Sequence, residues 1–288
     1  MSQLLPNSTP PAFLDPRLQP VAIALNQVAF SYPDNPDILQ DITLTIRDRE
    51  RVGLIGHNGC GKTTLFMLIC GLLKASNGTI TVFDKPVQPN QFQPEVGLLF
   101  QDPEDQLFSP SVRDDIAFGP ENLGLEHSEV MARVEAALEL TGITALAERP
   151  PHHLSGGEKQ MVAIAGLLAM CPRILLYDEP TASLDLRTRR RLIRFLQQSD
   201  ETLLVASHDL EFLLETCDRV ILLDEGRIIA DGIPHEVMGN QTLMENHGLE
   251  KPHSLIPHAD PHHTRSNMKP VEKIKGVEGR EWRVEGRE

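Results

Sequence analysis

The sequence predicts an α/β fold, in which buried parallel strands alternate with helices and one helical segment is inserted. Three observations lead to this prediction. Short runs of leucine or β-branched residues at 174–177, 203–206 and 220–223 are typical of strands that are buried on both faces. A glycine-rich loop at 56–63 follows an apolar strand and begins a helix. Residues 128–140 carry apolar side chains at the spacing of a half-buried helix, which belongs to the insertion.

The first third of the chain alternates between strands and turns. An alternating apolar pattern begins at residue 21, after a lead-in of residues 1–20 that is rich in proline and polar residues and that we expect to be flexible. Strands are expected at 21–32, 42–46, 51–55, 79–83 and 96–100, and a helix at 62–72. We therefore expect order from the first of these strands onward.

The remainder divides into an insertion, the end of the main domain and an extension. We expect a helical insertion at about 103–170, which ends in a long helix at 155–170. The main domain is expected to cover 21–240, followed by a C-terminal extension at 241–288. From about Lys251 the extension carries histidines and a near-repeat of Val-Glu-Gly-Arg-Glu. We expect this end of the chain to be disordered.

Composition and charge limit the classes of function. A chain of 288 residues with 40% apolar residues can bury the core of one large or two small domains. Its net charge of −14 argues against an extended nucleic-acid surface, because phosphate contacts need clustered lysine and arginine. The four cysteines are scattered without CxxC spacing, so we expect a reduced, cytosolic compartment. The longest apolar stretch, 161–177, is interrupted at 171–173 and falls short of the roughly 20 residues that cross a bilayer.

The glycine-rich loop carries the strongest chemical signal. It reads Gly-His-Asn-Gly-Cys-Gly-Lys-Thr and matches GxxxxGK[ST] between a strand and a helix. Glycines let backbone amides converge on phosphate oxygens, Lys62 reaches the β and γ phosphates, and the Thr63 hydroxyl can bind Mg²⁺. The alternative is a glycine turn without nucleotide, and Cys60 is expected to fill space rather than act in redox chemistry. The residues predicted to bind nucleotide here are Gly56, His57, Asn58, Gly59, Cys60, Gly61, Lys62, Thr63 and Thr64.

Two carboxylates follow the apolar run at 174–177. Asp178 is expected to project from the carboxyl end of a buried strand, where α/β sheets bind their ligands, and it can hold Mg²⁺ directly or through water. Glu179 is positioned to polarise the attacking water, since phosphoryl transfer needs an oriented nucleophile. The alternative is that this pair of acids only caps a strand. The phosphate-binding loop upstream favours the catalytic interpretation.

A second set of backbone donors occurs at 154–160, which reads Leu-Ser-Gly-Gly-Glu-Lys-Gln. Ser155, Gly156 and Gly157 are not preceded by a strand and have no counterpart of Lys62. We interpret them as half of a phosphate site that another subunit completes.

Together these motifs resemble those of the ATP-binding cassette (ABC) ATPases, and the similarity runs from about residue 21 to 239. The resemblance implies a P-loop fold with a RecA-like core, an antiparallel β subdomain and a helical signature subdomain. It also implies ATP and Mg²⁺ as cofactors. The signature motif, whose amides bind the γ-phosphate held by the other subunit, is matched by Ser155, Gly156, Gly157 and Glu158.

The same resemblance implies roles for four single residues. Gln101 matches the lid-loop glutamine that contacts Mg²⁺ and the attacking water, and His208 matches the switch histidine that contacts the γ-phosphate. Asp185 matches the loop that communicates across the dimer. Tyr32 matches the aromatic residue that stacks on adenine. A surface role for Tyr32 and a core role for His208 are the alternatives.

Three positions depart from the family pattern. Glu158 stands where many relatives have glutamine, and Met161 stands where arginine is frequent, but neither change removes a phosphate donor. Leu186 replaces a frequent proline after Asp185, which leaves the course of that loop open.

Two further stretches are similar to ATPases of the energy-coupling-factor importers. Residues 101–108 resemble their lid loop, in which Leu107 and Phe108 suit either docking of a partner or burial in the core. Residues 247–255 resemble the terminal stretch of the cobalt and nickel branch. The histidines near this end suit either a metal-holding tail or a solvated tail, and they are His253, His258, His262 and His263.

This second resemblance implies the ATP-hydrolysing subunit of such an importer, with cobalt or nickel as the first expectation. The expected partners are a second ABC ATPase subunit, identical or paralogous, a transmembrane coupling protein and a substrate-binding membrane protein, with no nucleic acid. The expected location is peripheral, on the cytoplasmic face of the cell membrane. The alternatives are a vitamin importer of the same type, a soluble ABC ATPase outside transport, and a metal chaperone that uses the histidine tail.

Overall fold

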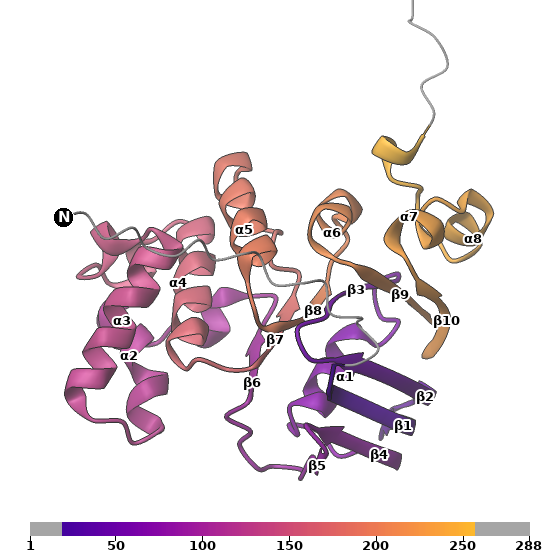
Figure 1. Cartoon of the computed structure of the whole chain (residues 1–288), viewed down its shortest axis with the longest axis horizontal. Helices are drawn as coiled ribbons and strands as arrows, with labels where there is room; N and C mark the ends of the chain where they lie inside the picture. Colours follow the sequence, from indigo (N-terminus) through magenta and orange to yellow (C-terminus); the bar gives the residue numbers. More distant parts are fainter. Residues whose placement is uncertain (1–18, 257–288) are drawn as a thin grey trace, which may run out of the picture. The chain divides into compact units, whose positions relative to one another are not determined.

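The computed structural model describes residues 19–256, which contain two β-sheets and two groups of helices (Figure 1). Most of the predicted lead-in and the end of the predicted tail, including His258, His262 and His263, lie outside the described residues. Within the described part, no helix is both long and apolar enough to cross a bilayer. The four cysteines all lie in this part, and each is a free thiol.

An antiparallel sheet of four strands forms the first layer. Its strand order is β2-β1-β4-β5, with β1 at Val21–Tyr32, β2 at Asn35–Arg47, β4 at Asn77–Val82 and β5 at Lys85–Pro86. The pairing of β1 with β2 continues to Tyr32 and Asn35, so β2 begins before the predicted 42–46. Asp37 and Asp41 have left-handed φ angles of 58° and 52°, and the register shifts along this pair. These irregularities interrupt the apolar alternation, and for that reason the early part of β2 was not predicted.

The second sheet has six strands in the order β10-β9-β3-β8-β7-β6. Five of these strands are parallel to one another, namely β6, β7, β8, β3 and β9. The sixth, β10, pairs antiparallel with β9. Their bounds are β3 Arg51–Ile55, β6 Val96–Leu99, β7 Ile174–Asp178, β8 Thr202–Ala206, β9 Arg219–Asp224 and β10 Arg227–Gly232. Every residue of β7 and β8 is buried, as the apolar runs predict. The carboxyl ends of the parallel strands meet at one edge, where α/β folds bind ligands.

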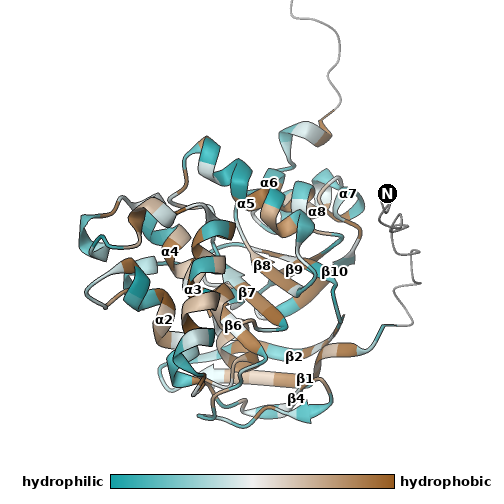
Figure 2. Cartoon of the chain, turned by 60° about the vertical axis from the view of Figure 1, so that its left-hand side comes forward, coloured by the Kyte–Doolittle hydropathy of each residue, from teal (hydrophilic) through white to brown (hydrophobic). Residues whose placement is uncertain are grey.

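Alternate residues of this sheet face two different hydrophobic clusters, because successive side chains of a strand point to opposite faces. Ile174 and Leu176 of β7 join the cluster of helix α1 (Lys62–Ile69) and the antiparallel sheet. Leu175 and Tyr177 join the cluster of the remaining helices. Figure 2 shows the apolar colour concentrated on the strands of this sheet and teal on the outer helices. The sheet is therefore covered on both faces, which confirms the predicted α/β class.

The helical insertion is a group of three helices that pack on one another, α2 (Val112–Asn122), α3 (His127–Thr141) and α4 (Gly156–Ala169). Short 3-10 turns at Pro103–Gln106, Thr144–Leu146 and Pro151–His153 precede or connect them. Helix α1 is shorter than the predicted 62–72, because Cys70 caps it and Gly71 turns the chain away with a φ of +74°.

The C-terminal part of the described chain continues beyond the predicted domain limit at 240. Helices α5 (Leu186–Gln198) and α6 (Leu210–Thr216) follow β7 and β8, and α7 (Pro234–Val237) and α8 (Gln241–Asn246) follow β10. A last 3-10 turn spans His253–Leu255. The side chain of Met244 in α8 is fully buried. The first residues of the predicted extension therefore pack on the same compact unit as the sheets.

Candidate active site

The glycine-rich loop connects β3 to α1 and has little room for side chains. A Cβ atom on Gly56 would lie 2.1 Å from the Leu223 carbonyl oxygen, and one on Gly61 would lie 2.7 Å from Leu39 Cδ2. Gly61 also has a φ of +109°, a conformation that residues with a side chain rarely adopt. The glycines thus let the backbone curl tightly between the strand and the helix. This tight turn places the start of α1 at a cleft that the loop also lines.

Lys62 begins α1, and its side chain reaches back to the start of this loop. Its side chain is buried, and Nζ donates to the carbonyl oxygens of Gly56 at 2.8 Å and His57 at 3.1 Å. Cys60 is buried beside it, and burial raises the pKa of the Cys60 thiol. A protonated, buried thiol is a poor nucleophile, which agrees with the space-filling role predicted for Cys60.

Thr63 and Asp178 bring two oxygen ligands together at the edge of the sheet. The Thr63 hydroxyl donates to Asp178 Oδ2 at 2.5 Å, although 115 positions separate the two residues in the sequence. Burial raises the pKa of Asp178, and the hydrogen bond from Thr63 and the charge of Lys62 oppose this effect. Gln101 lines the same cleft. A hydroxyl, a carboxylate and an amide oxygen are the hard donors that Mg²⁺ binds, so these residues fit the predicted metal.

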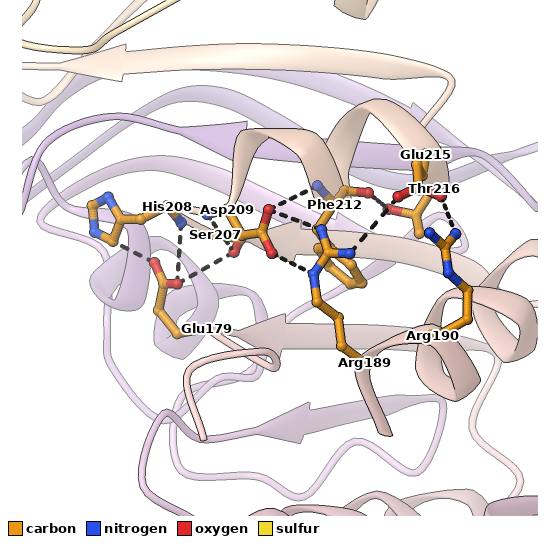
Figure 3. Close-up of polar contacts among 9 residues, drawn as sticks. All are labelled: Glu179, Arg189, Arg190, Ser207, His208, Asp209, Phe212, Glu215 and Thr216. Atoms are coloured by element: carbon orange, nitrogen blue, oxygen red, sulfur yellow. Dashed lines mark hydrogen bonds and ion pairs between the residues drawn. The ribbon is translucent and has the colours of Figure 1, made fainter. Parts of the chain in front are cut away.

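Glu179 follows β7 in a strained conformation, with a φ of 50° and a buried carboxylate. Glu179 Oε2 accepts hydrogen bonds from the His208 backbone N–H at 3.1 Å and from the Ser207 hydroxyl at 3.3 Å (Figure 3). Glu179 Oε1 is buried and accepts no hydrogen bond among the described residues, although His208 Nε2 lies 3.4 Å away. Burial is the main cause that raises the pKa of Glu179. This geometry leaves one carboxylate oxygen available to accept a proton.

His208 lies between the two sides of the cleft. Its Nε2 is 2.7 Å from Asn58 Oδ1 in the glycine-rich loop, and its backbone N–H binds Glu179. The side chain is 42% exposed, so it is not a core histidine. His208 therefore contacts both the phosphate-binding loop and the predicted base.

These residues surround a cleft of about 500 Å³. The predicted site residues that line it are Asn58, Gly59, Gly61, Lys62, Thr63, Thr64, Gln101, Asp178, Glu179 and His208. Asn35 and Ile38 also line it and were not predicted from the sequence. Both lie in the irregular first part of β2, which explains why the apolar pattern gave no signal for them.

The predicted signature residues lie at the start of α4, apart from the lining of this cleft. Ser155 and Glu158 form a capping box, in which the Glu158 carboxylate accepts from the Ser155 N–H and hydroxyl, both at 2.8 Å. Ser155 and Gly156 are exposed. The helix therefore presents its first turn on the surface.

Comparison with known proteins identifies the family. A model of the ABC transporter family matches residues 39–182. A putative ABC transporter ATP-binding protein of Synechocystis is 61% identical over 236 residues, which are 82% of this chain and 83% of the relative. The chain belongs to the ABC transporter ATPases. It is therefore an ATPase and binds ATP.

Two further relatives indicate which type of ABC ATPase this chain is. The energy-coupling factor transporter ATP-binding protein EcfA of Methanothermobacter thermautotrophicus is 42% identical over 238 residues, 80% of this chain and 76% of the relative. The structure of cbiO1 from Clostridium perfringens, described as part of the ABC transporter complex cbiONQ, matches with a TM-score of 0.70. That match has 36% identity and covers 79% of this chain and 94% of cbiO1. The chain is an ABC ATPase of the energy-coupling-factor type, which energises a transporter.

Tyr32 of this ABC ATPase lies beside the cleft without lining it. It ends β1 opposite Asn35, which does line the cleft, and its ring meets Phe30 edge-on with centroids 4.8 Å apart. The residue is 37% exposed. Stacking on adenine stays a prediction for this residue.

Asp185 lies at the N-terminus of α5, where its carboxylate accepts from the Thr188 N–H at 2.7 Å. This hydrogen bond lowers the pKa of Asp185. The neighbouring Ser183 lies next to the signature turn, since a Cβ atom on Gly157 would be 3.2 Å from the Ser183 carbonyl oxygen. The signature turn and the loop at 183–185 thus lie side by side on the surface. Neither lines the cleft itself, although Ser183 lines an adjoining hollow with Thr63 and Asp178.

Proposed function

We propose that this ABC ATPase hydrolyses ATP for an importer of the energy-coupling-factor type and works as a head-to-tail dimer with a second ABC ATPase. The observation that carries this proposal is the separation of two halves of a phosphate site within one chain. The cleft holds Lys62, Asp178 and Glu179, whereas Ser155 and Gly156 are exposed elsewhere. Each half needs a counterpart, and a second subunit supplies it.

Within the cleft, we assign roles by geometry. The loop amides and Lys62 bind the β and γ phosphates, and Glu179 accepts a proton from the attacking water through its unpaired Oε1. His208 is held between Asn58 and Glu179 and contacts the γ-phosphate. Thr63, Asp178 and Gln101 hold Mg²⁺, which neutralises charge on the phosphates when bound.

The second half of the composite site is the signature turn of the other subunit. Its exposed residues Ser155 and Gly156, and the half-buried Gly157, lie at a helix N-terminus, where anions are stabilised. Asp185 and Leu186 beside it contact the partner. Leu186 is 86% exposed, which favours its burial against another protein surface.

An apolar groove next to the lid loop suits the transmembrane coupling protein. It has a volume of about 520 Å³. Gln106 of the lid loop lines it together with Phe100, which precedes that loop, and with Phe92 and Met170. The Phe92 side chain is 63% exposed. Phe108 is 65% exposed and stacks edge-on with Phe118, whereas Leu107 packs against the core. The two residues of the predicted docking pair therefore differ, and Phe108 is the one available to a partner.

A cobalt or nickel ion is the substrate class that we favour. The support is the similarity to cbiO1 and the stretch at 247–255. A vitamin importer of the same type is the alternative, since the EcfA relative names no substrate. The other alternative, a soluble ABC ATPase outside transport, does not agree with the energy-coupling-factor type of the relatives.

Isolation of the complex tests this proposal. The full chain carrying an affinity tag is purified from membranes in mild detergent, and its partners and metal content are measured by mass spectrometry. We expect two membrane proteins and cobalt or nickel to copurify, with ATP-dependent uptake of that ion in vesicles. Copurification of a vitamin, or of no membrane protein, would contradict the corresponding part of the proposal.

Removal of residues 256–288 separates the importer from a metal chaperone. An importer subunit keeps its hydrolysis and uptake, because the cleft and the groove lie outside this segment. A chaperone that depends on the histidine tail would lose its metal.

A further inference from the structure

An ion pair connects α5 with the start of α6. It joins two loops to which we assign different roles: the loop at 183–185, which faces the partner, and the turn at 207–209, which contacts the predicted base. Arg189 in α5 donates to both carboxylate oxygens of Asp209, through Nε at 2.7 Å and Nη2 at 3.0 Å (Figure 3). The two side chains are only 19% and 29% exposed. A bidentate pair that is mostly shielded from water fixes the relative positions of its two elements more strongly than a surface pair does.

The Asp209 end of this pair continues into the cleft. Asp209 follows His208 directly, and its backbone N–H donates to the Ser207 hydroxyl at 3.1 Å. The Ser207 hydroxyl in turn donates to Glu179 Oε2, the oxygen that also accepts from the His208 N–H. Asp209 Oδ1 additionally caps α6 through the Phe212 N–H at 2.9 Å. The turn at 207–209 is thus one hydrogen-bonded unit with the predicted base.

The Arg189 end of the pair continues to the exposed loop before α5. The Arg189 backbone N–H donates to the Asp185 carbonyl oxygen at 2.8 Å. The Asp185 carboxylate caps the same turn through Thr188. A displacement of Asp185 or Leu186 by a partner subunit therefore moves Arg189 with it, because all of these residues lie in one helical turn.

We propose that Arg189 is a positioning residue, which links contact of the second subunit at Asp185 and Leu186 to the orientation of His208 and Glu179. The inference rests on the head-to-tail dimer and the roles proposed above. The physical path is a continuous series of hydrogen bonds, from the Asp185 carbonyl through Arg189, Asp209 and Ser207 to the Glu179 carboxylate. The guanidinium carries its charge permanently, and the Asp209 carboxylate raises the pKa of Arg189 further.

Two substitutions break this link in different ways. Arg189→Gln removes the charge and the bidentate contact but keeps a helix-forming residue. Asp209→Asn keeps the cap of α6, because asparagine is a good N-cap residue, but it loses the charged pair. Arg190→Gln is the matched control, since Arg190 neighbours Arg189 on α5 and shares Glu215 with it as an ion-pair partner, but does not contact Asp209.

The test measures kcat and KM for ATP and the melting temperature of each variant of the full-length protein. ATP-dependent dimer formation is measured separately, with each substitution combined with Glu179→Gln so that ATP is not consumed. For Arg189→Gln and Asp209→Asn we expect kcat to fall about tenfold or more, because small misplacements of catalytic groups are costly. We expect KM and the dimerisation constant to stay within about twofold, since neither residue contacts ATP. Arg190→Gln keeps its kcat, and the double variant is no slower than the slower single variant.

Three results would overturn the inference. The first is an unchanged kcat in Arg189→Gln. The second is a fall in kcat that follows the loss of dimer or of folded protein, which would make the pair purely structural. The third is an equal fall in Arg190→Gln, which would indicate a general effect of charge on this helix. If Glu179→Gln alone kept full hydrolysis, the proposed base would be wrong instead, so the two failures are distinguishable.

Discussion

Glu179 combines a strained backbone with a buried, partly unpaired carboxylate. A left-handed conformation costs a residue with a side chain free energy, and such residues persist where the surroundings hold them and the site uses them. Here the Glu179 N–H donates to the Ala206 carbonyl oxygen at 2.9 Å, which fixes the turn against β8. The turn directs the carboxylate toward Ser207 and His208. The strained backbone of Glu179 therefore fixes the position of the proposed base.

Replacing Glu179 with glutamine tests that role. Glutamine has the same size but cannot accept the proton of the attacking water, so we expect kcat to fall by about 10² to 10⁴. Binding of a fluorescent ATP analogue should remain within about twofold of the wild type, because Glu179 is not a phosphate ligand in this assignment. Glu148→Gln, on the surface and paired with Arg113, is the control. Unchanged hydrolysis in Glu179→Gln would refute the assignment.

The buried position of Glu179 also predicts how hydrolysis depends on pH. Burial raises the pKa of this carboxyl above its usual value of about 4.3. Only the ionised form accepts a proton, so kcat is full above the raised pKa and declines as the pH falls through it. A profile of kcat against pH, measured where the protein stays folded by circular dichroism, checks this. An acid limb at the pH of an ordinary glutamate would contradict the argument.

At the scale of elements, the phosphate-binding loop is attached to the C-terminal segment. Asp224, at the end of β9, lies 2.7 Å from His57 Nε2 and 2.6 Å from His247 Nδ1. A carboxylate only accepts hydrogen bonds, so His247 Nδ1 donates to Asp224, and His57 Nε2 lies close enough for an ionic contact. His57 belongs to the loop and His247 follows α8. The stretch that resembles other importer ATPases at 247–255 thus begins at a residue that is connected to the phosphate-binding loop through Asp224.

Loss of this contact should be measurable as lost stability. His247→Ala removes a hydrogen bond to a charged, mostly buried carboxylate, and we expect a destabilisation of about 1 to 3 kcal/mol. Urea unfolding at neutral pH, followed by circular dichroism, gives the difference in the free energy of unfolding. His235→Ala, on α7 and away from Asp224, should change it by less than about 0.5 kcal/mol. Equal effects of both substitutions would argue against a specific role for the contact.

At the scale of the whole molecule, the proposed head-to-tail dimer requires that the two halves of the phosphate site come from different chains. Lys62→Ala removes the phosphate-binding lysine of the cleft, and Gly157→Asp places a negative charge at the signature turn. Each variant alone should be nearly inactive. Mixed in equal amounts, they should recover about a quarter of the wild-type rate, since half of the dimers are mixed and each has one intact site. Activity that does not recover on mixing, while both variants fold, would exclude shared sites.

Much of the fold followed from local patterns. Val21–Tyr32 and Arg51–Ile55 have the bounds that their apolar patterns predict. Strands β7 and β8 differ from prediction by one residue at one end, and β9 by one residue at each end. The first half of β2 was missed, because residues in left-handed conformations interrupt its alternation. The cleft residues after β3, β7 and β8 could be predicted, since each follows an apolar run. Asn35, Ile38 and Arg189 could not, because nothing in their local sequence distinguishes them from surface residues.

The sequence alone determined the class of fold, the phosphate-binding loop and the acids that follow β7. These features depend on residue type at short spacing, which sequence records directly. Only the tertiary structure decided which distant residues meet, such as Thr63 with Asp178, Glu179 with His208, and Arg189 with Asp209. Such contacts depend on the order of strands in the sheet and on the packing of helices over it. Both result from the burial of the whole apolar core and not from any single segment.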